Sequence, residues 1–216
     1  MRTKTPDNAV TLFDEAAATW DKPLRVELAK GVARAILARI NTNKSMTAME
    51  FGCGTGLVTA LLAPHLGKIV ATDNSSGMLD ELRKKIAGLD IANITTRQLD
   101  LTRESLPEER FQLIYSSMTL HHIEDINALL RTFHALLSPG GRIALADLDR
   151  EDGTFHSDHT GVAHLGLKKK ELLGLAKDAG FTELTVETAH VIRKEGNDGR
   201  EHDYPVLLLS GMKEAN

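Results

Sequence analysis

The chain has 216 residues, of which 42% are hydrophobic and 26% charged, with a formal net charge of −4 at pH 7. These values are typical of one soluble globular domain that needs no disulfide or metal to fold. The acidic balance excludes a broad phosphate-binding surface, so we expect neither a nucleic-acid nor a membrane partner. The single cysteine, Cys53, excludes an intrachain disulfide. Without a signal peptide or a run of about 18 apolar residues, we expect a cytoplasmic protein.

Apolar residues alternate along the chain between helical spacing and short continuous runs. The first helix should start near Pro23 with Asp21 as its cap, and Ser75 and Asp125 should cap later helices. Apolar periodicity predicts helices at 24–40, 57–66, 76–88, 126–137 and 169–179. Short apolar runs predict strands at 46–51, 68–72, 94–99, 111–116, 142–148, 181–187 and 204–212. The segments 149–167 and 193–203 are polar and show neither pattern.

This alternation of strands and helices predicts an α/β fold, with a mostly parallel sheet covered on both faces. Between 187 and 204 the chain has no helix-sized apolar stripe, so the last two strands should pair antiparallel. We expect one domain, in which 1–45 forms N-terminal lid helices, 46–148 a cofactor-binding half and 149–216 a substrate-shaping half.

Glycines and carboxylates gather where the first three predicted strands end. Gly52, Gly54 and Gly56 lie between the first strand and the next helix, where backbone N–H groups can approach a ligand closely. Asp73 ends the second strand 21 residues after Gly52, a spacing that suits a carboxylate bonded to ribose hydroxyls. Asp100 ends the third strand and could accept from an adenine amine. It could equally cap a turn before Thr102.

Five segments resemble the motif series of class I S-adenosylmethionine-dependent methyltransferases. They are 48–56 (AMEFGCGTG), 71–79 (ATDNSSGML), 99–100 (LD), 111–122 (FQLIYSSMTLHH) and 137–141 (LSPGG). The fourth segment resembles the small-molecule branch, that of type 11 and ubiquinone-biosynthesis-like enzymes. Phe13-Asp14 and Trp20-Asp21 resemble its N-terminal lid. The resemblance implies a Rossmann-like three-layer sandwich with seven strands, the last antiparallel, and S-adenosylmethionine as cofactor.

The resemblance also implies a role for individual residues. The three glycines would contact the methionine portion of the cofactor, and Glu50 would orient the turn or the cofactor's amino group. Asn74 and Met78 would flank the adenine. Trp20 would close over the site or anchor the first helix to the sheet. The implied cofactor-binding residues are Trp20, Glu50, Gly52, Gly54, Gly56, Asp73, Asn74, Met78, Asp100, Leu101, Ser116 and His121.

Two other functions compete with methyl transfer. A nicotinamide oxidoreductase would place the third glycine of its G-x-G-x-x-G fingerprint at position 57, where Leu57 stands. A binding module that holds the cofactor without catalysis would keep all these motifs. Among methyltransferases, a cytosine-C5 enzyme would need a nucleophilic cysteine near the fourth strand, and the Asn/Asp-Pro-Pro-Tyr/Phe motif of amino-methylating enzymes is absent. These exclusions leave a small-molecule acceptor.

Several of the nine histidines lie where an acceptor should bind. His122 and His156 are the expected general bases, because imidazole can take up a proton near neutral pH. The expected substrate-binding residues are Asp147, His159 and His164. Alternatively, the histidines of 149–167 belong to a solvated loop, and His121 bonds a backbone carbonyl. A further alternative is a transition-metal site, to which Asp147 or Asp149 would add an oxygen and with which the spacing of His159 and His164 is compatible. No CxxC or HExxH pattern supports that site, so we expect no metal.

Overall fold

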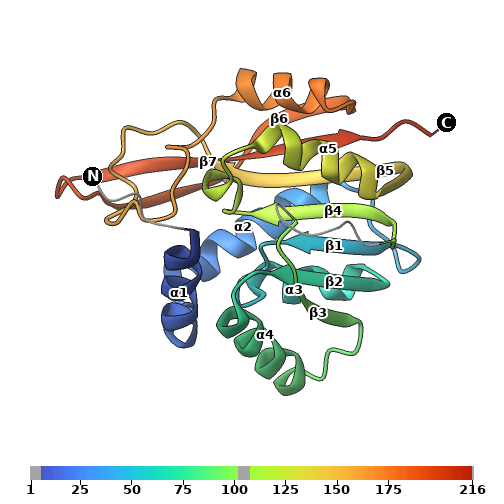
Figure 1. Ribbon diagram of the computed structural model, residues 1–216, viewed down its shortest axis with the longest axis horizontal. Coiled ribbons are helices and arrows are strands. Elements are labelled where there is room, and N and C mark those ends of the chain that lie inside the picture. Colours follow the sequence, from blue (N-terminus) through green and yellow to red (C-terminus); the bar gives the residue numbers. More distant parts are fainter. Residues whose placement is uncertain (1–5, 102–107, 216) are drawn as a thin grey trace.

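A computed structural model describes residues 6–101 and 108–215 of the chain, with only the backbone for 6–9. The described residues form one seven-stranded sheet of order β3-β2-β1-β4-β5-β7-β6 (Figure 1). The strands are β1 (Thr47–Phe51), β2 (Lys68–Asp73), β3 (Ile94–Gln98), β4 (Phe111–Ser117), β5 (Leu137–Leu148), β6 (Thr182–Glu195) and β7 (Glu201–Met212). Strands β1 to β5 are parallel, and β7 is antiparallel to both β5 and β6, as predicted.

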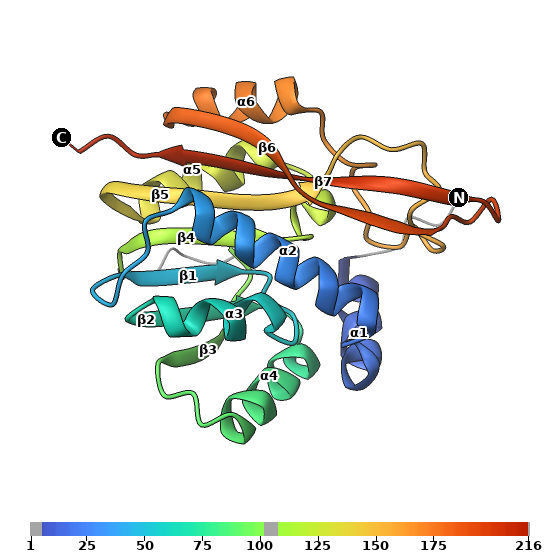
Figure 2. The ribbon, with the colours of Figure 1, turned by 180° about the vertical axis from the view of Figure 1, so that it is seen from behind.

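Helices cover both faces of the sheet and form the three expected layers. They are α1 (Pro6–Ala16), α2 (Pro23–Arg39), α3 (Leu57–Leu62), α4 (Ser76–Gly88), α5 (Ile126–Leu136) and α6 (Lys169–Asp178), with short 3-10 turns η1 (Ala17–Thr19), η2 (Ala63–His65) and η3 (Leu120–His122). The helices α2, α3 and α4 share one apolar core with the sheet, and α2 and α3 cross that face in Figure 2. The helices α5 and α6 form a second core on the other face.

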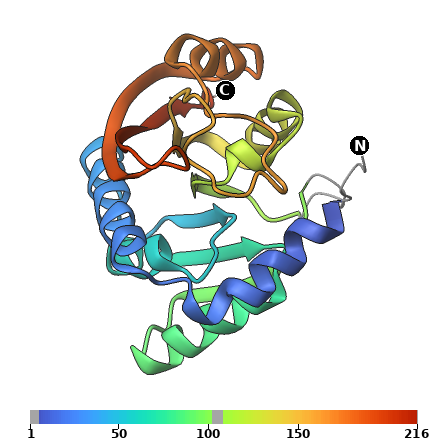
Figure 3. The ribbon, with the colours of Figure 1, turned by 90° about the vertical axis from the view of Figure 1, so that its left-hand side faces the viewer.

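Because β1, β2, β4 and β5 are parallel, their carboxyl ends lie at one edge of the sheet, called here the carboxyl edge. Helix α1 and the segment 149–168 both lie at this edge, on the left of Figure 1 and facing the viewer in Figure 3. In α/β sheets of this kind, ligands bind outside the carboxyl ends of the strands. No described helix is both long and apolar enough to cross a membrane.

Two of the three predicted helix caps are confirmed. The Ser75 hydroxyl accepts from the Met78 N–H at 3.1 Å, and the Asp125 carboxylate accepts from the Ala128 N–H at 2.9 Å. Helix α2 begins at Pro23 as expected, but the cap prediction for Asp21 is wrong, because the cap is Lys22, which makes no side-chain bond. The Asp21 carboxylate bonds elsewhere in the fold, as described below.

The polar segment 193–203 is largely strand, contrary to the sequence pattern. The β6–β7 ladder continues to the pair Glu195–Glu201, and Arg193 pairs with Asp203 at 2.7 Å across it. Backbone pairing and ion pairs hold this exposed hairpin end, so it needs no apolar alternation. The predicted helix at 57–66 also differs, since it ends at Leu62 and continues as η2, which contains Pro64.

Candidate active site

The turn after β1 is built from three glycines with positive φ: +67° at Gly52, +53° at Gly54 and +75° at Gly56. A Cβ at Gly52 would lie 2.4 Å from Thr119, and one at Gly56 would lie 2.2 Å from Leu82. At Gly54 the nearest atoms would be 3.9 Å away or more. Two glycines therefore satisfy packing, while Gly54 has space beside its Cα that packing does not require. The contact of this turn with the methionine portion of the cofactor stays a prediction.

Asp73 faces the glycine turn from the end of β2. One carboxylate oxygen accepts from the Gly54 N–H at 2.8 Å, and the other accepts from the Ser75 N–H at 2.9 Å. Burial raises the pKa of Asp73, although these backbone bonds oppose the rise. A carboxylate has about four acceptor positions, so two remain for ribose hydroxyls. Of the two residues expected to flank the adenine, Asn74 is exposed and Met78 is buried.

Glu50 lies beneath the turn rather than beside the ligand position. Its side chain is 1% exposed and accepts a hydrogen bond from the Thr59 hydroxyl of α3. Burial raises the pKa of Glu50 to about 8, so it is largely a neutral carboxylic acid at pH 7. The Thr72 hydroxyl bonds its carbonyl at 2.7 Å. Glu50 thus links β1, β2 and α3, a position that supports the first of its two expected roles, orienting the turn.

The remaining cofactor-side residues differ in how they are held. The Leu99 N–H bonds the Asp73 carbonyl at 3.0 Å, which brings the segment before Asp100 beside β2. Leu101 is buried. Ser116 is also buried, and its hydroxyl donates to the Phe51 carbonyl at 2.7 Å, so it links β4 to β1. The capping alternative for Asp100 involves Thr102, which lies outside the described residues.

Two carboxylates fasten the N-terminal segment to the cofactor half. Asp14 of α1 accepts from the Ser75 hydroxyl at 2.6 Å and from the Gly77 N–H at 2.8 Å. Asp21 accepts from the Thr55 hydroxyl at 2.5 Å and pairs with Lys85 at 2.8 Å. These contacts place Trp20 over Gly54, with the indole nitrogen 3.9 Å from an added Cβ there. The resemblance of 13–14 and 20–21 to a lid was the available signal, but it did not show what these carboxylates bind.

At the end of β4, His121 and Asp147 form a buried pair. The His121 Nδ1–H donates to the Asp147 carboxylate at 2.7 Å, and the Leu148 N–H donates to the same oxygen at 2.7 Å. Burial acts to raise the pKa of Asp147, but the charge and hydrogen bond of His121 outweigh it and leave the pKa below its usual value. Each residue is 1% exposed. The structure thus places both side chains in a buried pair, and their predicted contacts with cofactor and substrate stay predictions.

His122 and His156 lie together beside this pair. Their ring centroids are 6.2 Å apart, and each lies within about 5 Å of the His121 ring, at 4.0 and 5.1 Å. Burial lowers the pKa of both to about 4, with a smaller contribution from the His121 charge. Both are therefore neutral at pH 7. The His122 Nδ1–H donates to the Gly161 carbonyl at 2.8 Å, which leaves its Nε2 as the nitrogen that carries a lone pair.

The other two predicted histidines differ in environment. His159 is exposed, and its ring lies 6.4 Å from that of His156. His164 donates through Nε2 to the Ile123 carbonyl at 2.8 Å and so fastens the segment 149–168 to the end of η3. Within 6–101 and 108–215, no three His, Cys, Asp or Glu side chains are placed to hold a metal ion.

Met118 was missed by the sequence reasoning. It follows β4 directly and has φ +58°, an uncommon conformation for a non-glycine residue. Its N–H bonds the Ala146 carbonyl at 2.8 Å, and the next residue, Thr119, bonds the Gly52 carbonyl at 3.3 Å. Such strain collects at functional sites. Here the strained residue lies between β4 and η3, beside the contact of Thr119 with the glycine turn, and no residue type in the sequence signals it.

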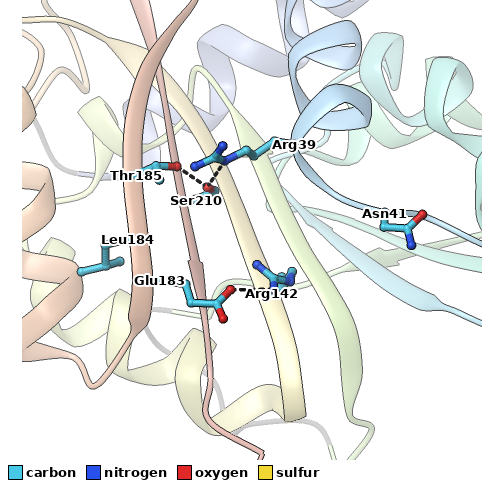
Figure 4. A pocket seen from close by; sticks show the side chains of 7 residues that line it. All are labelled: Arg39, Asn41, Arg142, Glu183, Leu184, Thr185 and Ser210. Carbon is cyan, nitrogen blue, oxygen red and sulfur yellow. Dashed lines mark hydrogen bonds and ion pairs between the residues drawn. The ribbon is translucent and has the colours of Figure 1, made fainter.

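A groove of about 530 Å³ lies at the opposite edge of the sheet, where β5 begins and β7 ends (Figure 4). Its polar groups bond one another: Arg142 pairs with Glu183 at 2.7 Å, and the Ser210 hydroxyl bonds Thr185 at 2.7 Å and Arg39 at 3.3 Å. No lining side chain is left buried without a partner among the described residues. The groove therefore does not compete with the carboxyl edge as the active site.

Comparison with known proteins identifies the class of the domain. Residues 48–141 match the model of a methyltransferase domain family. An uncharacterized methyltransferase of Schizosaccharomyces pombe is 30% identical over 65% of this chain and 55% of its own length. Malonyl-[acyl-carrier protein] O-methyltransferase of Priestia megaterium is 29% identical over 76% of this chain and 57% of its own length. The chain thus spans about half the length of the curated relatives that it matches.

Solved structures agree on the fold. The DhpI–SAH complex has a TM-score of 0.75 at 18% identity and covers 97% of this chain and 96% of its own. A SAM-dependent methyltransferase of Aquifex aeolicus has a TM-score of 0.66 at 19% identity, covering 97% and 99%. The matched region, the relatives and the fold together support the class I S-adenosylmethionine-dependent methyltransferases as the family of this chain. The family and the cofactor predicted from the motifs are therefore confirmed, and the dinucleotide alternative is set aside.

Proposed function

We propose that this protein transfers the methyl group of S-adenosylmethionine to a small-molecule acceptor. One observation carries the proposal: the glycine turn, open at Gly54 and faced by Asp73, lies at the same sheet edge as two neutral imidazoles. Relatives named phosphoethanolamine N-methyltransferase 1 of Arabidopsis thaliana and trans-aconitate 2-methyltransferase of Variovorax paradoxus support an acceptor of small size.

When bound, S-adenosylmethionine supplies an electrophilic methyl group and a neutral leaving group. The protein's contribution is mainly to hold the acceptor in line with that methyl, which can lower the barrier by roughly 7–11 kcal/mol. His122 accepts the proton that a hydroxyl or ammonium acceptor must lose, through the lone pair on Nε2. Asp147 acts through His121, whose ring packs against His122 with centroids 4.0 Å apart. His156 is the second candidate base.

Calorimetric titration with S-adenosylmethionine, its demethylated product and NAD tests the cofactor. Both sulfur ligands should bind in about the micromolar range, and NAD should not bind. Asp73→Asn should weaken that binding, while Asp80→Asn serves as a matched control, because Asp80 is an exposed carboxylate of α4 that pairs only with Arg83 among the described residues. Binding of NAD alone would contradict the proposal.

Turnover is tested by release of the demethylated product with a panel of small acids, phosphate esters, phenols and amines. Once an acceptor is found, His122→Asn should lower kcat by roughly 10²–10⁴-fold, as the loss of a general base does. His156→Asn measures the rival base, and His65→Asn, at an exposed site after α3, is the control. Cofactor binding without turnover on any acceptor would favour the non-catalytic module.

A further inference from the structure

Arg25 of α2 is a half-buried cation without a carboxylate partner among the described residues. Its guanidinium lies over the Trp20 ring, 3.6 Å from the centroid, and donates to the Trp20 carbonyl at 2.9 Å. Burial lowers the pKa of Arg25, and Asp21 only partly opposes this. The Asp21 carboxylate is already bonded to Thr55 and Lys85. Because a guanidinium has five donors, most of those on Arg25 remain available to a ligand.

Lys194, near the end of β6, is a second cation of this kind. Its ammonium lies 4.0 Å from the centroid of the Phe155 ring and donates to the Phe155 carbonyl. Burial lowers the pKa of Lys194, Glu151 opposes the shift, and the charge of Arg25 adds to it. Within the described residues no carboxylate lies within ion-pair distance of this ammonium. Two of its three donors stay free.

A row of contacting aromatic rings connects Arg25 with His122, the proposed base. The Trp20 ring contacts Phe13 at 5.7 Å between centroids, and Phe13 contacts His122 at 5.4 Å, both edge to face. Because Trp20 also lies over Gly54, this row of rings runs beside the open part of the glycine turn. Arg25 is thereby held on the side of His122 that faces the glycine turn.

A second row of rings leads from the histidines to Lys194. The rings of His122 and His156 are 6.2 Å apart, and those of His156 and Phe155 are 4.8 Å apart. The charge of Lys194 contributes to lowering the pKa of His156. Helix α2 packs directly on β6, since a Cβ on Gly31 would lie 2.6 Å from His190. The two rows therefore end at neighbouring elements, and the two cations flank one group of aromatic side chains.

This arrangement favours an oxyanion over an ammonium as the group recognised. Partly desolvated cations without carboxylate partners are unfavourable until an anion binds, and a guanidinium matches carboxylate and phosphate geometry. A cation of the chain itself already covers one face of Trp20 and one face of Phe155. We propose that the acceptor carries a carboxylate or a phosphate group, which Arg25 and Lys194 bind so that the reacting atom is directed toward His122. This inference rests on the proposed methyltransferase function and adds the class of acceptor.

The single tryptophan of the chain reports on this site. Trp20 emission is followed while succinate, inorganic phosphate or the uncharged succinamide is added at constant ionic strength, in the presence of S-adenosylhomocysteine. Succinate or phosphate should change the emission to saturation, and succinamide should not. The tighter of the two oxyanions then distinguishes a carboxylate from a phosphate acceptor.

Variants identify the residues responsible. Arg25→Gln and Lys194→Gln should each weaken oxyanion binding by roughly tenfold or more, as expected when a charge-assisted hydrogen bond is lost. Lys30→Gln on α2 and Arg193→Gln on β6 remove the same charge from the same two elements, but these side chains are exposed and paired with Glu27 and Asp203. The two control variants should bind like the native protein. Circular dichroism confirms that each variant is folded.

Two results would overturn the inference. The first is that neither oxyanion changes the Trp20 emission to saturation. The second is that succinamide changes it in the same way, or that all four variants respond like the native protein. Calorimetry with S-adenosylhomocysteine alone separates this failure from that of the proposed function. If S-adenosylhomocysteine binds while the oxyanions do not, only the acceptor class is wrong. If S-adenosylhomocysteine does not bind, the proposed function fails, and the inference that rests on it fails too.

Discussion

The two sides of the carboxyl edge hold their polar groups in different ways. On the β1–β2 side, backbone N–H groups of the glycine turn and of α4 bond carboxylates that follow regular strands, as at Asp73. On the β4–β5 side, side chains bond one another or a long segment without helix or strand, as at His121 and His122. The first arrangement depends on backbone geometry at turns and strand ends, with Asp73 bonded to residues 2 and 19 positions away. The second depends on contacts between residues 26 to 39 positions apart in the chain.

This difference predicts which substitutions should disrupt each side of the site. A site built from local backbone bonds tolerates changes around it but not within the turn. A site built from buried side-chain pairs is sensitive wherever one partner is lost, because the other is left buried and unpaired. The four predictions below test this contrast, in order of decreasing effect.

The largest effect is expected for the buried pair of His121 and Asp147 on the β4–β5 side. Asp147→Ala should lower the free energy of unfolding by about 3–5 kcal/mol, because the buried His121 loses its partner. Urea unfolding measures this loss. A double-mutant cycle with His121→Ala should show strong non-additivity. Additive effects of the two substitutions would mean that the pair is not coupled in the folded protein.

The next effect concerns pH and the cofactor side. The folded protein holds the proton of Glu50 up to a pKa of about 8, above the usual value for a glutamate. Stability from this group is therefore complete below pH 4.5 and is lost as the pH rises through 8. Between pH 6 and pH 9 the native protein should lose roughly 3 kcal/mol that Glu50→Gln retains. Parallel urea titrations of both proteins across this range would reveal the difference, and identical slopes would contradict it.

A smaller change is expected at Asp73. Asp73→Ser should weaken binding of S-adenosylmethionine by about 1.5–3 kcal/mol, the usual value of a hydrogen bond to a charged group. The Gly54 N–H loses its acceptor as well. Calorimetry measures the change, with Asp80→Ser as the exposed control on α4. A loss of binding that the control shares would point to a general effect of charge.

The smallest effect compares two glycines that both have room for a methyl group. Gly54→Ala should destabilise the protein by about 1–2 kcal/mol, because a non-glycine residue is strained at φ +53°. Gly174→Ala, on the exposed face of α6 with no atom within 4 Å of the added carbon, should stabilise it by about 0.5–1 kcal/mol. Thermal unfolding measures both. Equal shifts would show that φ does not matter at the turn.

Much of the fold follows from the sequence because the patterns that encode it are local. Apolar runs indicated all seven strands, and helical spacing indicated α2 to α6. Ser75 and Asp125 cap their helices through bonds to residues three positions ahead. The glycine turn and Asp73 could be predicted because backbone with positive φ and the ends of strands each favour characteristic residue types. The predictions were wrong where contacts in the fold differ from what the local residue pattern indicates, as with the cap at Asp21 and the polar strand ends at 193–203.

The sequence by itself determined the α/β class, the family, the cofactor and the residues of the turn that faces Asp73. Only the tertiary structure decided that Asp147 bonds His121, that Asp14 and Asp21 fasten the N-terminal segment, and that Arg25 and Lys194 flank one group of rings. The physical reason is how far apart in the sequence the interacting residues lie. Backbone turns and caps involve bonds over a few residues, whereas burial, and the pKa values and ion pairing that follow from it, depends on which distant segments pack together.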